Sequence, residues 1–133
     1  NSNMYLTEES MSLLDGVIDL YLTDFKYGNS RCAERLSNVK DYWDIITRNH
    51  AIARAQCEMI IRHLVLPGHF ECCSKPVLSW IAENLEGVRV NVMDQYRPEY
   101  NAHEFPELTS RLKKDEFMKA YMLARDLGLS ITD

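Results

Sequence analysis

Several signatures that would identify a function directly are missing from this sequence. It contains no GxGxxG, P-loop or GxSxG motif, so dinucleotide-binding, Walker-type nucleotide-binding and serine-hydrolase functions lack support. No apolar run approaches the roughly 20 residues that a helix needs to cross a bilayer. Basic residues are few, since 15 Lys and Arg stand against 20 Asp and Glu, and they form no stripe. Nucleic-acid binding depends on clustered cations. We therefore expect neither membrane insertion nor a nucleic-acid partner.

The sequence also has no CxxC pair. Its cysteines are Cys32, Cys57, Cys72 and Cys73. No basic-then-apolar leader precedes Met4, so we expect a cytoplasmic protein with free, buried thiols. His63 and His69 lie close in sequence to the two adjacent cysteines and suggest zinc, but this spacing is not that of a known ligand pair. We therefore predict no metal ligands.

What is present is a regular alternation of strand and helix patterns. Apolar, β-favouring segments predict strands at about 17–25, 59–66 and 88–93. Caps and helical spacing predict helices at about 7–15, 29–36, 41–55, 74–84 and 115–127, with a loop at 100–109. Such crossovers build a parallel sheet with helices outside it. The prediction is one α/β domain over residues 1–133.

Each predicted strand ends in polar or turn-forming residues, at the edge where parallel α/β folds place their functional groups. Asp24 and Lys26 are two residues apart and start toward the same side, so they could hold a zwitterion such as an amino-acid head group. A solvent-exposed ion pair is the alternative. Arg62 lies in an otherwise apolar strand and needs a partner or an opening, because burying a lone charge is costly. His63 points to the opposite face and is expected to pack rather than bind.

The third strand opens onto Asp94, Gln95, Tyr96 and Arg97. Arg97 could bind a carboxylate through its guanidinium fork, or remain a solvated loop cation. Three parallel strands leave an open edge, which stable domains avoid. Together with a start at Asn1 rather than at a methionine, this indicates a fragment of a larger domain, or a chain with an obligate partner.

Three segments resemble radical S-adenosylmethionine (SAM) proteins related to pyruvate formate-lyase activating enzyme. They are residues 14–28 (LDGVIDLYLTDFKYG), 61–68 (IRHLVLPG) and 90–100 (VNVMDQYRPEY). The resemblance is greatest to the branch often labelled PflX, and it covers the C-terminal half of the family's domain only. It implies a partial (β/α)6 TIM-like barrel, of which this chain forms the C-terminal half.

The family resemblance also implies a chemistry and its cofactors. Family members hold a 4Fe–4S cluster on a CxxxCxxC motif and cleave SAM reductively to a 5′-deoxyadenosyl radical. This sequence lacks CxxxCxxC and the glycine-rich element that holds the SAM amino group, so the cluster ligands would lie in a longer parent protein, and the chain alone is expected to be inactive. A glycyl-radical enzyme is a possible protein substrate.

Residue by residue, the resemblance assigns five positions to SAM binding. Asp24 and Lys26 match an Asp-x-Lys beside the methionyl group, and Arg62 matches an arginine in a strand that ends in Pro-Gly and lines the site. Gln95 and Tyr96 fall near a position where activating enzymes place a histidine. Asn1 and Asn3 match a polar strand end near the same cavity, at the tail of the family's fourth strand.

Two functions remain open at this stage. The chain is either part of a radical SAM enzyme, or a non-catalytic half-barrel that acts as an interaction or oligomerising module. In the second case it is expected to be stable as a homo-oligomer or in complex with a partner.

Overall fold

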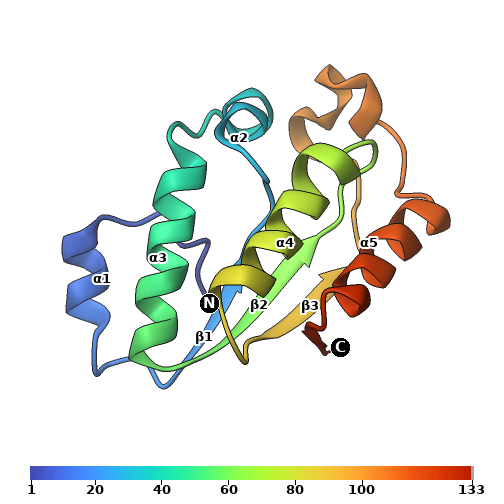
Figure 1. Cartoon of the computed structure of the whole chain (residues 1–133). Helices are drawn as coiled ribbons and strands as arrows, with labels where there is room; N and C mark the ends of the chain where they lie inside the picture. Colours follow the sequence, from blue (N-terminus) through green and yellow to red (C-terminus); the bar gives the residue numbers. More distant parts are fainter. Residues whose placement is uncertain (133) are drawn as a thin grey trace.

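Four parallel strands form a single sheet in the order β1-β2-β3-β4 in the computed structural model, which describes residues 1–132 (Figure 1). The strands are β1 (Leu20–Asp24), β2 (Glu58–Leu64), β3 (Arg89–Met93) and β4 (Ser130–Ile131). Each is joined to the next by a helical crossover. The chain is therefore a mixed α/β fold, as the alternating pattern predicts.

Five α-helices connect or flank these strands. They are α1 (Glu8–Leu14), α2 (Ser30–Ser37), α3 (Tyr42–Gln56), α4 (Lys75–Asn84) and α5 (Lys114–Asp126). Side-chain caps begin two of them, because the Thr7 hydroxyl accepts from the Ser10 N–H and the Asn29 side chain accepts from the Cys32 N–H. A π-helical turn, Phe70–Ser74, leads directly into α4.

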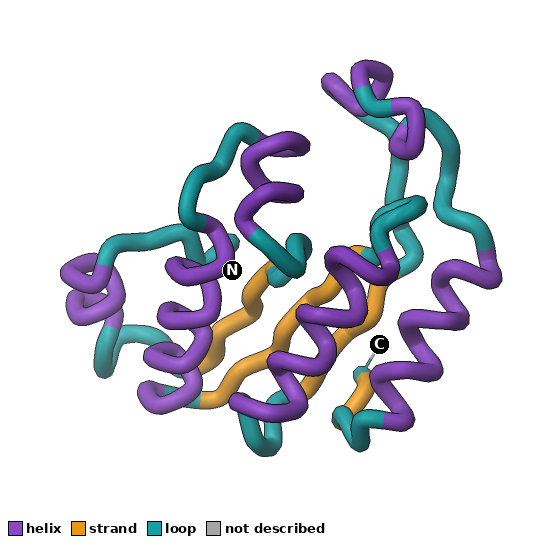
Figure 2. Tube along the Cα trace, turned by 45° about the horizontal axis from the view of Figure 1, so that its top comes forward, coloured by secondary structure: helices purple, strands orange, loops and turns teal. Residues whose placement is uncertain are grey.

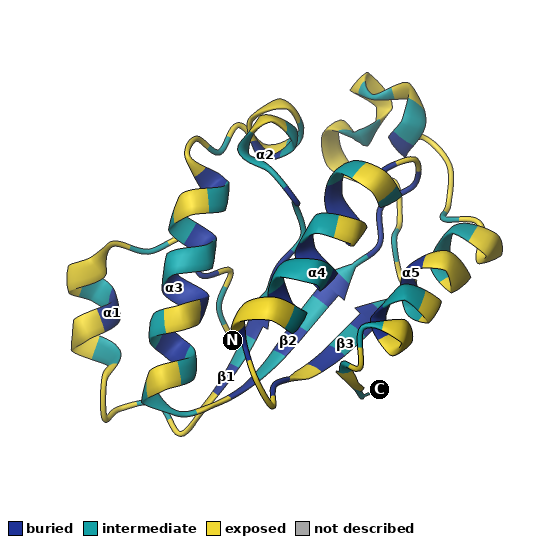
Figure 3. Cartoon of the chain, in the orientation of Figure 1, coloured by how far each residue is buried: buried dark blue, intermediate teal, exposed yellow. Residues whose placement is uncertain are grey.

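The helices cover one face of the sheet. Figures 1 and 2 show α1, α3, α4 and α5 on the same side of the strands, and among residues 1–132 no helix lies on the other side. Burial follows this arrangement, since alternate residues of β1, β2 and β3 are buried and the residues between them are only partly covered (Figure 3). Tyr21, Ile61 and Val90 belong to the buried set, whereas Leu22 and Ile60 belong to the partly covered one.

The second and third strands and the five helices lie close to their predicted positions, but three expectations were wrong. The first strand begins at Leu20, because Gly16 ends α1 in a left-handed turn (φ 73°) and β2 offers no partner before Glu58, which pairs with Leu20. The strand count was one too low, because β4 has only two residues and no periodicity to detect. The predicted loop at 100–109 contains two short 3-10 helices, Tyr100–Glu104 and Pro106–Leu108.

The N-terminal segment runs beside the outer edge of β1. Ser2 makes a parallel bridge to Thr23, because its N–H donates to the Leu22 carbonyl at 2.9 Å and its own carbonyl accepts from the Asp24 N–H at 2.9 Å. This edge is therefore partly paired, and Asn1 and Asn3 lie near the end of β1. No helix among residues 1–132 has the length and apolarity required to cross a membrane.

Candidate functional site

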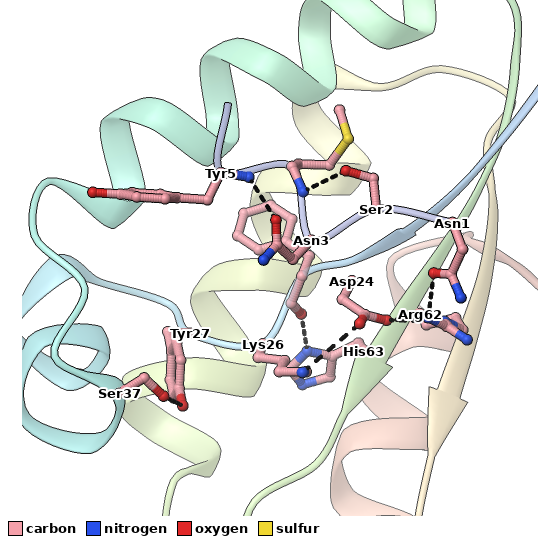
Figure 4. Close-up of polar contacts among 12 residues, drawn as sticks. Asn1, Ser2, Asn3, Tyr5, Asp24, Lys26, Tyr27, Ser37, Arg62 and His63 are labelled. Carbon is pink, nitrogen blue, oxygen red and sulfur yellow. Dashed lines mark hydrogen bonds and ion pairs between the residues drawn. The ribbon is translucent and has the colours of Figure 1, made fainter. Parts of the chain in front are cut away.

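Asp24, Lys26 and Arg62 meet at the carboxyl ends of β1 and β2 (Figure 4). Both Nε and Nη2 of Arg62 contact Asp24 Oδ1, at 2.9 and 2.8 Å, while Lys26 Nζ lies 3.7 Å from Asp24 Oδ2. One carboxylate therefore holds two cations, and the trio carries one excess positive charge. The ion pair expected as an alternative is present, and Arg62 has the partner that its position in an apolar strand requires.

The strand register explains why the trio forms. Asp24 and Arg62 are directly paired in the parallel ladder, and both point to the face of the sheet that the helices do not cover. The bridge at Ser2 adds a third element, because Arg62 Nη2 also donates to Asn1 Oδ1 at 2.8 Å. Arg62 and Asp24 remain 26% and 23% exposed, so the trio is open on one side.

Two adjoining hollows bring most of the predicted site residues together. The larger, about 610 Å³, extends from Lys26 past Gln95 and Tyr96 to the 3-10 segment. Its volume is within the range of small-molecule sites. The smaller, about 170 Å³, is lined by Asn3, Asp24 and Lys26 among others. Lys26 is common to both hollows.

The residues after β3 differ in how firmly they are held. Tyr96 is partly buried and its hydroxyl donates to the Leu108 carbonyl at 2.8 Å, whereas Gln95 is exposed. Arg97 also lines the larger hollow, and no carboxylate among residues 1–132 lies within ion-pairing distance of it. Asp94 and Arg97 therefore make no structural ion pair with the trio.

A buried histidine supports the loop that carries Lys26. His63 lies on the opposite face from Arg62, as predicted, and its Nδ1 donates to the Phe25 carbonyl at 2.8 Å while its Nε2 accepts from the Ser74 hydroxyl at 2.9 Å. Burial lowers the His63 pKa to about 4, so the ring is neutral at pH 7. His63 therefore has a positioning role between Asp24 and Lys26, which sequence spacing did not reveal.

Tyr42, at the start of α3, holds the same loop from the other side. Its hydroxyl accepts from the Lys26 N–H at 3.1 Å, and burial raises its pKa to about 12. The side chain stays a neutral phenol and contributes shape and a hydrogen bond rather than charge. The backbone at Lys26 is thus fixed independently of the ammonium group, which pairs with Asp24 and is partly exposed.

A second polar cluster lies apart from the charged trio. The ligand atoms of Cys32, His69 and Cys72 all lie within 4.8 Å of one another. The spacing argument had grouped a different set, with His63 and Cys73 in place of Cys32, because Cys32 comes from α2 and is distant in sequence. Cys72 is partly buried, and its burial and the nearby Cys32 raise the pKa of its thiol.

The cysteines do not fit the cluster site of a radical SAM enzyme. In the family that the sequence motifs resemble, three thiolates of one CxxxCxxC motif hold the cluster, each on a different iron. The group found in residues 1–132 offers two thiolates and an imidazole, and its cysteines come from α2 and the π-helical turn rather than from one CxxxCxxC loop. No step of radical SAM chemistry can be assigned to these side chains.

Comparison with known protein sequences finds a relative of this chain. No family model matches the chain. It is 54% identical over 131 residues to an uncharacterized protein of Methanocaldococcus jannaschii, MJ0674, and the alignment covers 98% of this chain but 38% of that protein. The chain therefore spans well under half the length of this curated relative.

A solved structure defines the fold further. The crystal structure of a domain of pyruvate-formate lyase-activating enzyme from Bacteroides vulgatus matches 98% of this chain and 77% of its own chain, with a TM-score of 0.75 and 16% identity. The chain shares the fold of that domain. At this identity the match shows the architecture alone.

Proposed function

We propose that this chain supplies the C-terminal half of a radical SAM barrel and binds the methionyl end of SAM at the carboxyl edge of its sheet. The observation that carries the proposal is the position of the Asp24, Lys26 and Arg62 trio, on the uncovered face of a sheet that has the activating-enzyme fold. Ligands of parallel α/β folds lie at this edge.

The charges of the trio are complementary to those of a zwitterion. The carboxylate of a methionyl group can accept from Lys26 and from Arg62, while its ammonium can approach Asp24 and the side-chain oxygen of Asn1. The hollow of about 610 Å³ beside Lys26 gives room for the rest of the molecule, next to Gln95 and Tyr96. The proposed SAM contacts are therefore Asp24, Lys26, Arg62, Gln95 and Tyr96, with Asn1 beside them.

In this proposal the 4Fe–4S cluster is held by residues outside this chain. SAM and a 4Fe–4S cluster, when bound, supply the 5′-deoxyadenosyl radical of the family's chemistry. This chain's residues bind and orient the methionyl group, and a segment outside them carries CxxxCxxC. A placement in the PflX-like branch and a glycyl-radical enzyme as substrate are finer parts of the same proposal, supported by the sequence motifs.

A non-catalytic half-barrel is the second candidate function. It is favoured by the uncovered sheet face and by the thiols of residues 1–132, which do not fit the cluster. The reading frame upstream of the Asn1 codon separates the two. An in-frame CxxxCxxC there supports the enzyme, whereas translation that starts at Met4 supports the interaction module.

Replacing Lys26 tests the binding site itself. In the full-length protein, Lys26→Met keeps much of the side-chain length and removes the charge. A charge-assisted hydrogen bond is worth about 1.5–3 kcal/mol, so SAM affinity should fall by about ten- to a hundredfold. Equilibrium titration of SAM measures this, with Lys114→Met, an exposed lysine at the start of α5, as the matched control.

A surface ion pair predicts a different result. Such a pair is worth less than about 1 kcal/mol and does not contact the ligand. Equal SAM affinities for the wild type and the Lys26→Met variant would therefore remove the trio from the site, even with the fold relation intact.

A further inference from the structure

The group of Cys32, His69 and Cys72 has the composition of a metal site. It combines two thiols and an imidazole from two separate segments, namely α2, which carries Cys32, and the π-helical turn with its N-cap residue, which carry Cys72 and His69. Zinc prefers these donors in a tetrahedral arrangement, in which two sulfur ligands are roughly 3.7 Å apart and a sulfur and a nitrogen roughly 3.5 Å apart. Ligand atoms that already lie within 4.8 Å of one another need only small side-chain movements to reach this geometry.

One tautomer of the His69 imidazole is favoured by its hydrogen bond. His69 Nδ1 lies 2.8 Å from the Pro67 carbonyl, which can only accept, so this nitrogen carries the proton and Nε2 presents a lone pair. A carbonyl partner on the far nitrogen is the usual outer-shell arrangement of a zinc-binding histidine. His69 is 4% exposed, so its ring is also held by packing.

Hydrogen bonds from Asn29 help to position both cysteines. Asn29 Nδ2 donates to Cys32 Sγ at 3.3 Å and to the Cys72 carbonyl at 2.8 Å, and thereby ties α2 to the π-helical turn. The chain at residues 28 and 29 can approach the π-helical turn this closely because Gly28 has no side chain. A Cβ at that position would lie 2.5 Å from the Cys72 carbonyl oxygen.

The group opens onto a hollow of about 630 Å³, which shares no lining residue with the two hollows at the charged trio. Arg35 and Glu107 line it, pair with each other and approach His69 Nε2 at 3.4 and 3.8 Å. Arg35 is 46% exposed, so its side chain can swing away and leave Nε2 accessible. Glu107 is then available near the fourth coordination position.

We propose that Cys32, His69 and Cys72 form a zinc-binding site with an open fourth position that faces this hollow. The two thiolates and the imidazole are the protein ligands, and water or the Glu107 carboxylate completes the tetrahedron. The site is independent of the proposed SAM edge and of any cluster, since its residues belong to neither.

The test uses the 133-residue chain, prepared metal-free under a non-chelating reductant. Co²⁺ added as a probe should bind with a stoichiometry of one, and give both a thiolate charge-transfer band and the intense visible bands of a tetrahedral site. Zn²⁺ should displace it. Competition with a chromophoric chelator then gives the Zn²⁺ affinity of each variant.

Cys32→Ser and Cys72→Ser should each lower this affinity by more than about a hundredfold, beyond the loss typical of an outer-shell change. Cys57→Ser is the matched control, because Cys57 is also free and partly buried but lies at the end of α3, outside the group. It should leave the affinity unchanged. Arg35→Met should raise the affinity several-fold, because it removes the cation that competes for Nε2 and frees Glu107.

Three outcomes would overturn the proposal. They are a Co²⁺ spectrum without the charge-transfer band in the wild-type chain, equal losses in the Cys57 and Cys32 variants, and unchanged Zn²⁺ affinity in the Cys72 variant. The wild-type spectrum does not depend on any substitution, so a variant that fails to fold cannot obscure the result.

Discussion

At the scale of single residues, two neutral histidines are built into the core near the site. His50 and His63 are both fully buried, and each donates from Nδ1 to a backbone carbonyl and accepts at Nε2 from a hydroxyl, that of Thr23 or Ser74. Burial lowers the pKa of both rings to about 4. Because every ring nitrogen is used by the neutral form, protonation must reverse the hydrogen bond between Nε2 and the hydroxyl as well as bury a charge.

Acid should therefore destabilise this protein in a defined range. The pKa of both rings is about 4 in the folded state and 6.5 as the ordinary value, so the unfolded chain binds protons first as the pH falls. The stability present above pH 6.5 is lost progressively down to about pH 4, by up to about 3 kcal/mol per histidine. Urea unfolding at several pH values measures this loss.

Substitution separates the histidines from other acid effects. His63→Gln and His50→Gln should each flatten the dependence of unfolding free energy on pH, whatever they cost in stability at neutral pH. His103→Gln should leave it unchanged, because His103 is exposed. If the pH dependence were unaltered in both the His63→Gln and the His50→Gln variant, the two buried histidines would not be the cause of the acid destabilisation.

At the scale of elements, a repeating apolar pattern predicts most strands and helices. Very short elements, and contacts between residues distant in sequence, leave no such pattern. Apolar runs, caps and helix-breaking residues predict strands β2 and β3 and the helices. Asp24 and Lys26 were predicted as site residues because they stand at the carboxyl end of the first strand. The two-residue β4 and the π-helical turn have no periodicity to detect. The neighbourhood of Cys32 and Cys72 depends on packing between crossovers, so spacing along the chain could not predict it.

The contact between the β1–α2 loop and the π-helical turn gives a prediction at this scale. In Gly28→Ala the new Cβ would lie 2.5 Å from the Cys72 carbonyl oxygen and 2.8 Å from the Cys73 Cα, all backbone atoms that cannot rotate away. The two elements must separate, and overpacking of this kind costs about 1–3 kcal/mol. Chemical denaturation should report that loss.

Gly16→Asn is the comparison for this effect. A Cβ at Gly16 meets nothing within 4 Å, and asparagine tolerates its left-handed conformation (φ 73°) better than other side chains do. We expect a change of a few tenths of a kcal/mol at most. If Gly28→Ala were equally mild, the close approach of loop and turn would not be a constraint on the fold.

At the scale of the whole molecule, the notable feature is a parallel sheet with helices on one face only. Parallel sheets are normally covered on both faces and read as continuous apolar runs. Here buried and partly buried residues alternate along the strands. The second face carries the half-covered apolar side chains of Leu22, Ile60 and Leu64 beside the charged Asp24 and Arg62. A face with this mixture suits the inside of a barrel, where apolar packing surrounds a polar site, and agrees with the half-barrel proposal.

This uncovered face should make the isolated chain self-associate. Leu22 and Ile60 are paired across β1 and β2, so together they form the apolar centre of the face. Burying them against a second copy removes apolar surface from water at roughly 25 cal/mol per Å². Sedimentation of the 133-residue chain at micromolar concentration should therefore show dimers or larger species.

The Leu22→Gln and Ile60→Gln double variant should shift that distribution toward monomer, because it places amides where the two copies would meet. Leu13→Gln is the matched control, since Leu13 is 78% exposed on α1, on the helical side of the sheet, and should leave the association unchanged. A longer protein that covers the face with its own strands should remain monomeric under the same conditions. A wild-type chain of 133 residues that stays monomeric would mean that the polar trio at the strand ends keeps this face soluble by itself, and would contradict the half-barrel proposal.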